Sequence, residues 1–493
     1  MDNITDNSHV FSKNELISIF DNVMDKKMRD VDKNNVFHKT IKHPKITGIA
    51  GDVVEQSILG YKADSHQKPD LIVDGVEVEL KTTGIRMSKK NKNKYEAKEP
   101  MSVTAVSPSK IIHENFSDSS FWHKAERLLL VYYLYESEVT VKAADYAEFP
   151  IVGYHFHEFD DEDVEILKND WELVRDFIKE LHETHINPKE GYPMLSSSLR
   201  SRLMMIDTAP KWPNPPRFRL KRATVTTFVQ KYFGLRLEKL DKGYTSFEEI
   251  DKQLHKYAEI YKGKTVQELI DILSIPVKLN HKEDVSKSVT EQIVTSMFGA
   301  KSKKISNIEL FSKLGICAKT ITQTKKNTRT EDTKLFSVNF DEWMDNRVIF
   351  EDSSLYSDFN ERQFLFIVFE EDSLEDLIKE KKFLGFKRVS FNEEFINKEV
   401  RYVWEDVRTK IFNNELKEVI YYDRDKKEYI NKNGTIKTAV NFPKASENSV
   451  FLRGTGKDST DKVVEINSIK MYRQNVWIKG KIIIDMLNMN EYI

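Results

Sequence analysis

The segment KPDLIVDGVEVELKTT, residues 68–83, places acids and a lysine in an otherwise strand-like apolar run. Its Asp-Gly pair at 74–75 predicts a two-residue hairpin turn in which both residues adopt positive φ. Counting outward from that turn places Asp70 opposite Glu79, with Cβ atoms about 5 Å apart. The alternation of side chains along a strand then puts Lys81 on the same face as Glu79. Two carboxylates and one ammonium group are therefore expected on one patch.

Such a patch is chemically suggestive because like charges directly opposed destabilise a sheet. A divalent cation offsets that repulsion, and Mg²⁺ binds one or two carboxylates together with waters and phosphate oxygens. A neighbouring lysine can orient or deprotonate a water, which is the chemistry of metal-assisted phosphodiester hydrolysis. The alternative is a solvated strand face that carries charges by chance.

The composition limits the remaining classes of protein. The chain has 493 residues, 39% hydrophobic and 32% charged, which predicts two or more domains. Its net charge of −2 means that nucleic-acid binding would need local basic patches. A single cysteine excludes a disulfide framework and fits a reducing cytoplasm. The sequence shows no signal-peptide pattern, bilayer-spanning run, zinc spacing, Walker loop or dinucleotide fingerprint.

The chain repeats its own order of elements. Helices are expected at 12–30, 48–60 and 161–183, and a buried strand at 127–135. After residue 245, similar segments follow in the same order: VTEQIVTSMFGAK, LGICAKTIT, RQFLFIVFEE, YVWEDVRTKIF and VWIKGKIIIDML. Ordered similarity of this kind predicts two homologous α/β lobes, joined around residues 236–245.

A family resemblance rests on the ordered segments GDVVEQSIL, KPD, GVEVELKTT, FWHKAERLLLVYY, NDWELVRDFI and FRLKR. Together they resemble the MutH-type endonucleases of the PD-(D/E)xK nuclease fold, through most of residues 12–235. The second lobe resembles the same family from about residue 247 to 493. Two such lobes in one chain resemble the Sau-type restriction enzymes that cleave GATC. The resemblance implies a catalytic domain over 1–240 and an inactive DNA-binding or allosteric domain over 241–493, each with a mixed central sheet flanked by helices.

The resemblance also implies roles for particular residues. Asp70 and Glu79 match the metal ligands, and Glu55 matches a further acidic residue at the metal site, with one or two metals left open. Lys81 matches the lysine that positions the attacking water, and Lys124, in WHKAER, matches a lysine beside the reacting phosphate.

One departure from the family pattern concerns the spacing of the two ligands. The gap between the aspartate and the glutamate is two residues longer than the family usually shows, which leaves Glu77 as a rival ligand. The hairpin count favours Glu79, which also lies two residues before Lys81.

The second lobe lacks the acids of the first. Cys317 takes the place of Glu79, and Lys319 alone survives. The aspartate position falls near Leu310 and the helix acid near Thr295. Without carboxylates there is little to hold Mg²⁺, so this lobe is expected to be catalytically inactive. Cys317 is interpreted as a small buried side chain.

The basic candidates for DNA contact lie in loops. The glycine-containing segment VFLRGTGKDSTDK, residues 450–462, allows close approach of backbone, and arginine can read guanine. An ordinary basic surface loop is the alternative at each position. The candidates are Arg453 and Lys457 in the second lobe, and Arg200, Arg202, Arg217, Arg219 and Lys221 in the first.

These inferences predict a cytoplasmic, Mg²⁺-dependent type II restriction endonuclease that cleaves double-stranded DNA at GATC. The second lobe is expected to bind a second DNA copy. Because one active site cuts one strand, two chains are expected to dimerise on DNA. A nicking mismatch-repair endonuclease has the same chemistry but usually one lobe. A non-catalytic DNA-binding protein is the alternative from another class.

Overall fold

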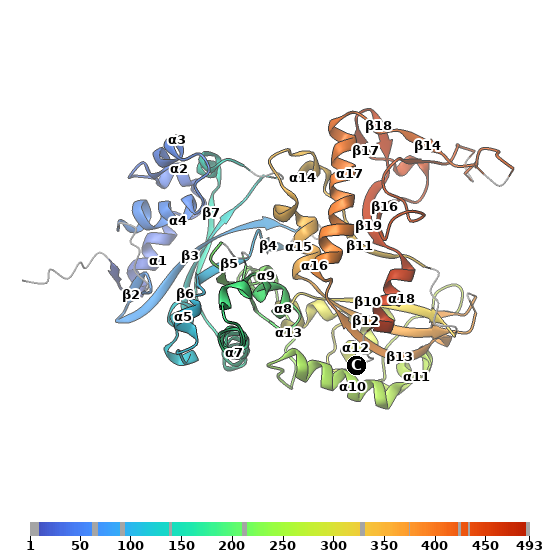
Figure 1. Cartoon of the computed structure of the whole chain (residues 1–493), viewed down its shortest axis with the longest axis horizontal. Helices are drawn as coiled ribbons and strands as arrows, with labels where there is room; N and C mark the ends of the chain where they lie inside the picture. The colour runs from blue at the N-terminus through green and yellow to red at the C-terminus, as the bar shows by residue number, and fades with distance from the viewer. Residues whose placement is uncertain are drawn as a thin grey trace, which may run out of the picture. The chain divides into compact units, whose positions relative to one another are not determined.

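The computed structural model describes residues 9–61, 68–88, 94–137, 141–209, 214–325, 331–373, 375–422, 425–431 and 434–489. The chain divides into two compact units, whose elements are labelled in Figure 1. Unit 1 consists of Met1–Ser137, Val141–Ile250 and Phe298–Gly315; unit 2 consists mainly of Asp251–Met297 and Ile316–Ile493. The main boundary therefore lies close to the predicted joint at 236–245, but one later segment returns to unit 1.

Unit 1 is built on a mixed sheet with the strand order β1-β2-β3-β6-β7, and β4 pairs with β3. Strand β3 runs parallel to β6, whereas β2–β3 and β6–β7 are antiparallel pairs. A smaller sheet has the order β5-β9-β8. The strands are β1 (Val10–Phe11), β2 (Leu71–Val73), β3 (Val76–Met87), β4 (Tyr95–Ala97), β5 (Met101–Ala105), β6 (Arg127–Leu134), β7 (Ile151–Glu158), β8 (Ile206–Asp207) and β9 (Arg217–Leu220).

Most helices of unit 1 lie where the sequence predicts them, but the first is shorter. Ser12 caps α1 in a capping box, and the helix ends at Asp21 rather than near residue 30. Asp25 has φ 61°, a left-handed conformation that breaks the helix before α2. The main helices are α1 (Lys13–Asp21), α2 (Met28–Val31), α4 (Ile49–Val53), continued by the π-helix Val54–Leu59, α6 (Ser120–Ala125), α7 (Asp161–Thr184) and α9 (Arg222–Tyr232).

The two faces of β3 have different environments. Val78 and Leu80 are buried in a core shared with α1, α4 and the π-helix, which Figure 1 shows grouped beside the sheet. Glu79 and Lys81 alternate with them and point to the other face. Val76 has the same strand parity as Val78 and Leu80, but it is 40% exposed because it sits at the tip of the hairpin.

A buried ion cluster fixes the returning segment 298–315 to unit 1. The Lys313 ammonium lies 2.7 Å from an Asp163 oxygen and 3.0 Å from a Glu309 oxygen. Lys231 contributes a further pair with Glu309 at 2.6 Å. Because lysine and acid are both largely removed from water, each needs the other, and the segment is held to α7 and α9.

Unit 2 contains two three-stranded sheets, with the orders β10-β12-β13 and β11-β19-β16, and two strand pairs, β14–β15 and β17–β18. The strands are β10 (Ile316–Thr324), β11 (Thr333–Ser337), β12 (Gln363–Glu371), β13 (Lys382–Val389), β14 (Glu418–Ile420), β15 (Thr438–Val440), β16 (Val450–Thr455), β17 (Val464–Ile466), β18 (Ile469–Met471) and β19 (Arg473–Ile478). The main helices are α10 (Phe247–Tyr261), which begins in unit 1, α11 (Val266–Ile272), α12 (Val289–Met297), α15 (Ser354–Glu361), α17 (Arg401–Phe412) and α18 (Gly480–Met489). The chain as a whole is thus a mixed α/β protein with several sheets.

The central strands of the two units share their pairing pattern. In unit 2, β10 runs parallel to β12 and β12 antiparallel to β13, as β3, β6 and β7 do in unit 1. Glu79 pairs with Leu128, the second residue of β6, and Cys317 pairs with the second residue of β12. Lys81 and Lys319 each pair with the fourth residue of the corresponding strand.

Within the described ranges, no helix combines the length and the apolar character that crossing a bilayer requires.

Candidate active site

The predicted hairpin is present. Asp74 and Gly75 have φ values of 48° and 84°, both in the left-handed region that a two-residue turn of this type needs. The register pairs Leu71 with Val78, Ile72 with Glu77 and Val73 with Val76, as the count from the turn predicts. Asp70 and Glu79 are the next residues outward on the two strands.

Asp70 is held in place by contacts that the sequence does not reveal. Its carboxylate accepts a hydrogen bond from the backbone N–H of Leu80 at 3.1 Å. Its own carbonyl lies 2.7 Å from Nδ1 of His9, and the turn residue Asp74 accepts from the backbone N–H of Lys13 at 3.2 Å. The start of the chain therefore anchors both ends of the short strand β2.

Glu79 lies buried between two ammonium groups. Its side chain is 1% exposed, and Lys81 Nζ lies 2.6 Å from its Oε1. Lys124, which α6 brings from a distant part of the sequence, donates to both carboxylate oxygens at 3.1 Å. Bonds between charged partners of this kind are short and strong, so the two lysines offset the cost of burying the carboxylate.

Burial and neighbouring carboxylates disfavour the ionised forms of Glu55 and Asp70. Burial, followed by the charge of Asp70, raises the pKa of Glu55 from its usual 4.5 to about 7. Burial and the charge of Glu79 raise the pKa of Asp70, against the lowering effects of Lys81, Lys124 and the Leu80 N–H. These shifts show that the three carboxylates lie close enough to repel one another.

The rival residue Glu77 faces solvent. It is exposed and pairs across the hairpin with Ile72, itself 40% exposed. The structure thus brings Glu55, Asp70 and Glu79 together and leaves Glu77 on the outer end of the hairpin.

The donor set suits a hard cation, although the side chains are not arranged around one. Among the described residues, no group of three or more His, Cys, Asp and Glu side chains is disposed to hold a metal ion. Mg²⁺ needs only one or two carboxylates, because waters and phosphate oxygens supply its other ligands. Burial first, and neighbouring carboxylates second, raise the pKa values of Glu55 and Asp70, and a bound cation would favour their ionised forms. The residues present therefore fit Mg²⁺ chemically.

Comparison with known proteins places this site in a family. The model of the family described as DNA mismatch repair enzyme MutH matches residues 59–170, which include the hairpin, Lys81 and Lys124. The chain contains a MutH-family domain. It is also 29% identical, over 384 residues, to the type II restriction enzyme Sau3AI of Staphylococcus aureus, and the match covers 73% of each chain.

At the corresponding place in unit 2, the carboxylates found in unit 1 are not reproduced. Cys317 is half-buried and packs against the core, which is close to the predicted filler role. Lys319 donates to the carbonyl of Lys334 at 3.0 Å instead of to a carboxylate. Thr295, predicted at the helix-acid position, is buried in α12. Leu310, predicted at the aspartate position, is also buried, but it lies in the helix Glu309–Lys313 of the segment that returns to unit 1 and therefore not in unit 2.

The basic residues of unit 1 that were predicted to contact DNA differ in their exposure and in their partners. Arg202 and Arg217 are exposed, and Arg200 is half-buried. Arg219 forms a two-pronged pair with Asp207, at 2.7 and 2.9 Å.

Lys221 is buried and bonded within the protein. It is 5% exposed and donates to the carbonyl of Leu203, so its ammonium group is engaged inside the protein.

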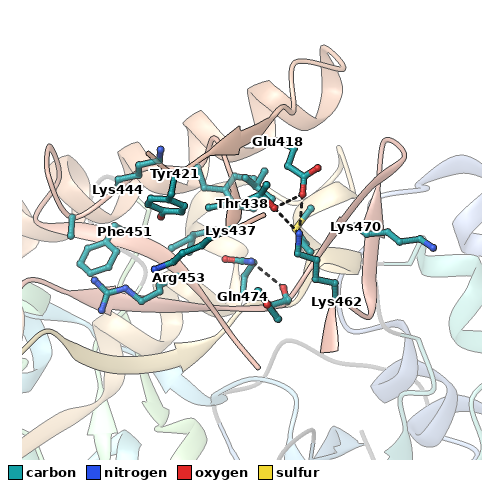
Figure 2. Close-up of a pocket in the computed structure, with 18 of the residues that line it drawn as sticks. Glu418, Tyr421, Lys437, Thr438, Lys444, Phe451, Arg453, Lys462, Lys470 and Gln474 are labelled. Carbon is teal, nitrogen blue, oxygen red and sulfur yellow. Dashed lines mark hydrogen bonds and ion pairs between the residues drawn. The ribbon is translucent and has the colours of Figure 1, made fainter. Parts of the chain in front are cut away.

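In unit 2, Lys457 is exposed, and Arg453 is exposed but pairs with Asp332 at 2.6 Å. Arg453 also borders a cavity of about 500 Å³ beside strands β14, β15 and β16. Figure 2 shows Lys437 and Lys444 next to Tyr421 in this cavity, whereas Lys462 is bonded to Glu418 and Thr438.

The sequence reading did not single out Tyr421, Lys437 and Lys444. No local pattern marks them, since Lys437 lies opposite Tyr421 just beyond the β14–β15 pair and Lys444 reaches the Tyr421 ring from a later segment.

Proposed function

We propose that this chain is a type II restriction endonuclease that hydrolyses phosphodiester bonds of duplex DNA, at GATC as the family resemblance implies. The observation that carries the proposal is the similarity to a type II restriction enzyme along 73% of both chains. The convergence of carboxylates and lysines at the hairpin supports it, because this is the equipment that phosphodiester hydrolysis needs.

Asp70 and Glu79 would hold Mg²⁺, with Glu55 as a further acidic residue at the same site. When bound, the ion supplies positive charge that activates water and stabilises the developing phosphorane. Whether Glu55 contacts the same ion or a second one stays open.

The lysines act on the substrate directly. Lys81 has three N–H donors, of which one is directed to Glu79 at 2.6 Å, so the others are available to orient the attacking water. Lys124 lies on the other side of Glu79, on α6, and would donate to a non-bridging phosphate oxygen as charge grows there. Glu79 thus holds both lysines in position before the substrate arrives.

The second unit would be an inactive relative of the first. The equivalent strand registers of Glu79 with Cys317 and of Lys81 with Lys319 support two tandem MutH-like lobes. In functional terms, residues 1–240 form the catalytic domain, and residues 241–493 form a domain that binds a second DNA copy and activates the first. The loop with Arg453 and Lys457 is its proposed DNA surface.

In the catalytic domain, Arg202 and Arg217 are the proposed DNA contacts, with Arg200 and Arg219 beside them, because their environments leave them closer to solvent than Lys221. One domain cuts one strand, so a double-strand break requires two chains on the same site. We propose that dimerisation occurs on DNA, and that the protein acts in the cytoplasm.

Incubation of unmethylated supercoiled plasmid with the full chain, in Mg²⁺ or in EDTA, tests the proposal. Linear fragments with ends at GATC, formed only in Mg²⁺, are the expected result. Nicked circles without linear products would favour the second candidate, a mismatch-repair type nicking enzyme, which the family match at residues 59–170 supports. Retarded plasmid without cleavage would contradict both and identify a DNA-binding protein.

A further inference from the structure

Unit 2 has a cationic cavity beside the position that corresponds to the active site of unit 1. The cavity measures about 590 Å³ and is lined by residues of β10, β11, β16 and β19 and by the turn before α12. Lys319, which has the same strand register as Lys81, lines the cavity. Lys287 and Lys334 add two further ammonium groups.

The charges of this cavity are only partly balanced. Two carboxylates also line it, but Asp332 is bonded to Arg453 at 2.6 Å and to the backbone N–H of Gly480 at 3.2 Å. Glu331, the second acid, is exposed. Among the described ion pairs, none joins a carboxylate to one of the three lysines of the cavity. Burial and the charge of Lys319 lower the pKa of Lys334, as expected where two ammonium groups lie close together.

Among the described residues, two that line the cavity carry buried neutral donors without acceptors. Within the described part of the chain, neither the buried hydroxyl of Thr333 nor the buried indole N–H of Trp477 has a hydrogen-bond partner. Trp477 pairs across β11–β19 with Lys334, so the Trp477 and Lys334 side chains share a face. Thr333, the neighbour of Lys334 on β11, is 8% exposed and points to the opposite face with Ile478, so its hydroxyl is not one of the donors to a ligand. An unpaired buried donor costs about 1–3 kcal/mol, which a bound acceptor would recover.

The contrast with unit 1 explains why the cavity suits an anion rather than a cation. There, Lys81 is neutralised by Glu79 at 2.6 Å. Here, Cys317 replaces the acid, and Lys319 donates only to the carbonyl of Lys334, which leaves N–H donors free to bind a ligand. Ammonium groups together with the neutral N–H donor of Trp477 match the several oxygens of a phosphate group.

We infer that the cavity lined by Lys319, Lys334 and Trp477 binds a backbone phosphate of duplex DNA without a metal ion. The inference rests on the proposed DNA binding of unit 2 and states which residues grip the backbone there. Loss of the catalytic acid would thus have turned a metal-dependent site into a direct lysine–phosphate contact. Unit 2 would bind DNA in EDTA, and the contact would carry no sequence preference.

The indole N–H of Trp477 provides a local reporter for a test with the full chain. The protein is labelled with ¹⁵N at tryptophan, and the Trp477→Phe variant identifies its resonance. Inorganic phosphate and a short duplex are titrated separately in EDTA, which prevents cleavage. We expect the Trp477 resonance to shift with both ligands and to saturate, because the N–H gains an acceptor.

Two double variants show whether the lysines cause that shift. Lys319→Ala/Lys334→Ala should abolish the response of Trp477 to both ligands. It should also reduce the slope of log affinity against log salt by about 2, one for each phosphate-contacting lysine. Lys256→Ala/Lys278→Ala removes the same charge from exposed positions of unit 2 and should leave the response unchanged.

The outcomes separate this inference from the proposed function. If two duplexes bind each chain but Trp477 does not respond, the phosphate site is wrong while DNA binding by unit 2 stands. If phosphate shifts the resonance and the duplex does not, the site binds a free anion and the DNA assignment is overturned. A response that persists in Lys319→Ala/Lys334→Ala, with its remaining tryptophan resonances unchanged, refutes the role of the lysines.

Discussion

The raised pKa of Glu55 makes a direct prediction about stability. Replacement by glutamine keeps the size of the side chain but removes the ionisation. Because the pKa in the folded protein, about 7, lies above the usual 4.5, ionised Glu55 destabilises the fold. Its stabilising contribution is complete below pH 4.5 and is lost as the pH rises through 7. Glu55→Gln should therefore be more stable than the original chain at pH 8, and nearly equal to it at pH 5.

The magnitude follows from the two pKa values. The difference between 4.5 and about 7 corresponds to roughly 3.4 kcal/mol at 1.36 kcal/mol per pH unit. Glu55 is only half-buried, so solvent screening reduces the effect to about 1–2 kcal/mol. By the same reasoning, the difference in unfolding free energy between Glu55→Gln and the original chain is less than about 0.5 kcal/mol at pH 5.

The assay must report on unit 1 alone, because a chain with two compact units does not unfold as one two-state system. Hydrogen exchange of peptides from β3, measured at both pH values, reads the opening free energy where the acids lie. His155 and His157 are half-buried, and removal from water lowers their pKa values to about 4 and 3. They lower the stability in acid, since each must gain a charge on unfolding below about pH 6.5. Their contribution is the same in both proteins and cancels in the difference.

The control is Glu77→Gln on the same hairpin. Glu77 is exposed, so its replacement should change the opening free energy by no more than about 0.5 kcal/mol at either pH. Equal stabilisation by both variants would indicate a general charge effect. A difference between Glu55→Gln and the original chain that does not grow from pH 5 to pH 8 would refute the carboxylate cluster. Added Mg²⁺ at pH 8 should stabilise the original chain more than Glu55→Gln.

Three further predictions concern cleavage. Asp70→Asn keeps an oxygen for the Leu80 N–H but removes repulsion with Glu79. The stability of the metal-free protein should therefore rise by up to about 1 kcal/mol, while plasmid cleavage is lost. A variant that still cuts refutes the metal-ligand proposal. Lys124→Ala should lower the cleavage rate about 10²–10³-fold and destabilise unit 1 by about 1–3 kcal/mol, since Glu79 loses one of two ammonium partners; unchanged single-turnover rates would exclude Lys124 from the reaction. Cys317→Ser should cleave plasmid at the original rate with its melting temperature little changed, and loss of cleavage would contradict an inactive second unit.

The hairpin and its charges were determined by the sequence. An Asp-Gly pair between apolar runs specifies the turn, and the period of two then fixes the face of every side chain from Leu71 to Lys81. This local information was also sufficient to favour Glu79 over Glu77. The long amphipathic helix α7 and the buried strand β6 are equally local, because their apolar periodicity extends over many residues.

Only the tertiary structure decided what surrounds the hairpin. Lys124 contacts Glu79 across 45 residues of sequence, and His9 lies against Asp70 across 61, distances over which no local pattern applies. The early end of α1 and the burial of Lys221 depend on neighbours that the chain brings from elsewhere. The cavity around Trp477 exists because β19 pairs with β16 and also with β11, which lies more than a hundred residues earlier in the chain. Local propensity sets the direction in which each side chain points. Long-range packing sets which residues that side chain contacts, and the charge of a buried group depends on those contacts.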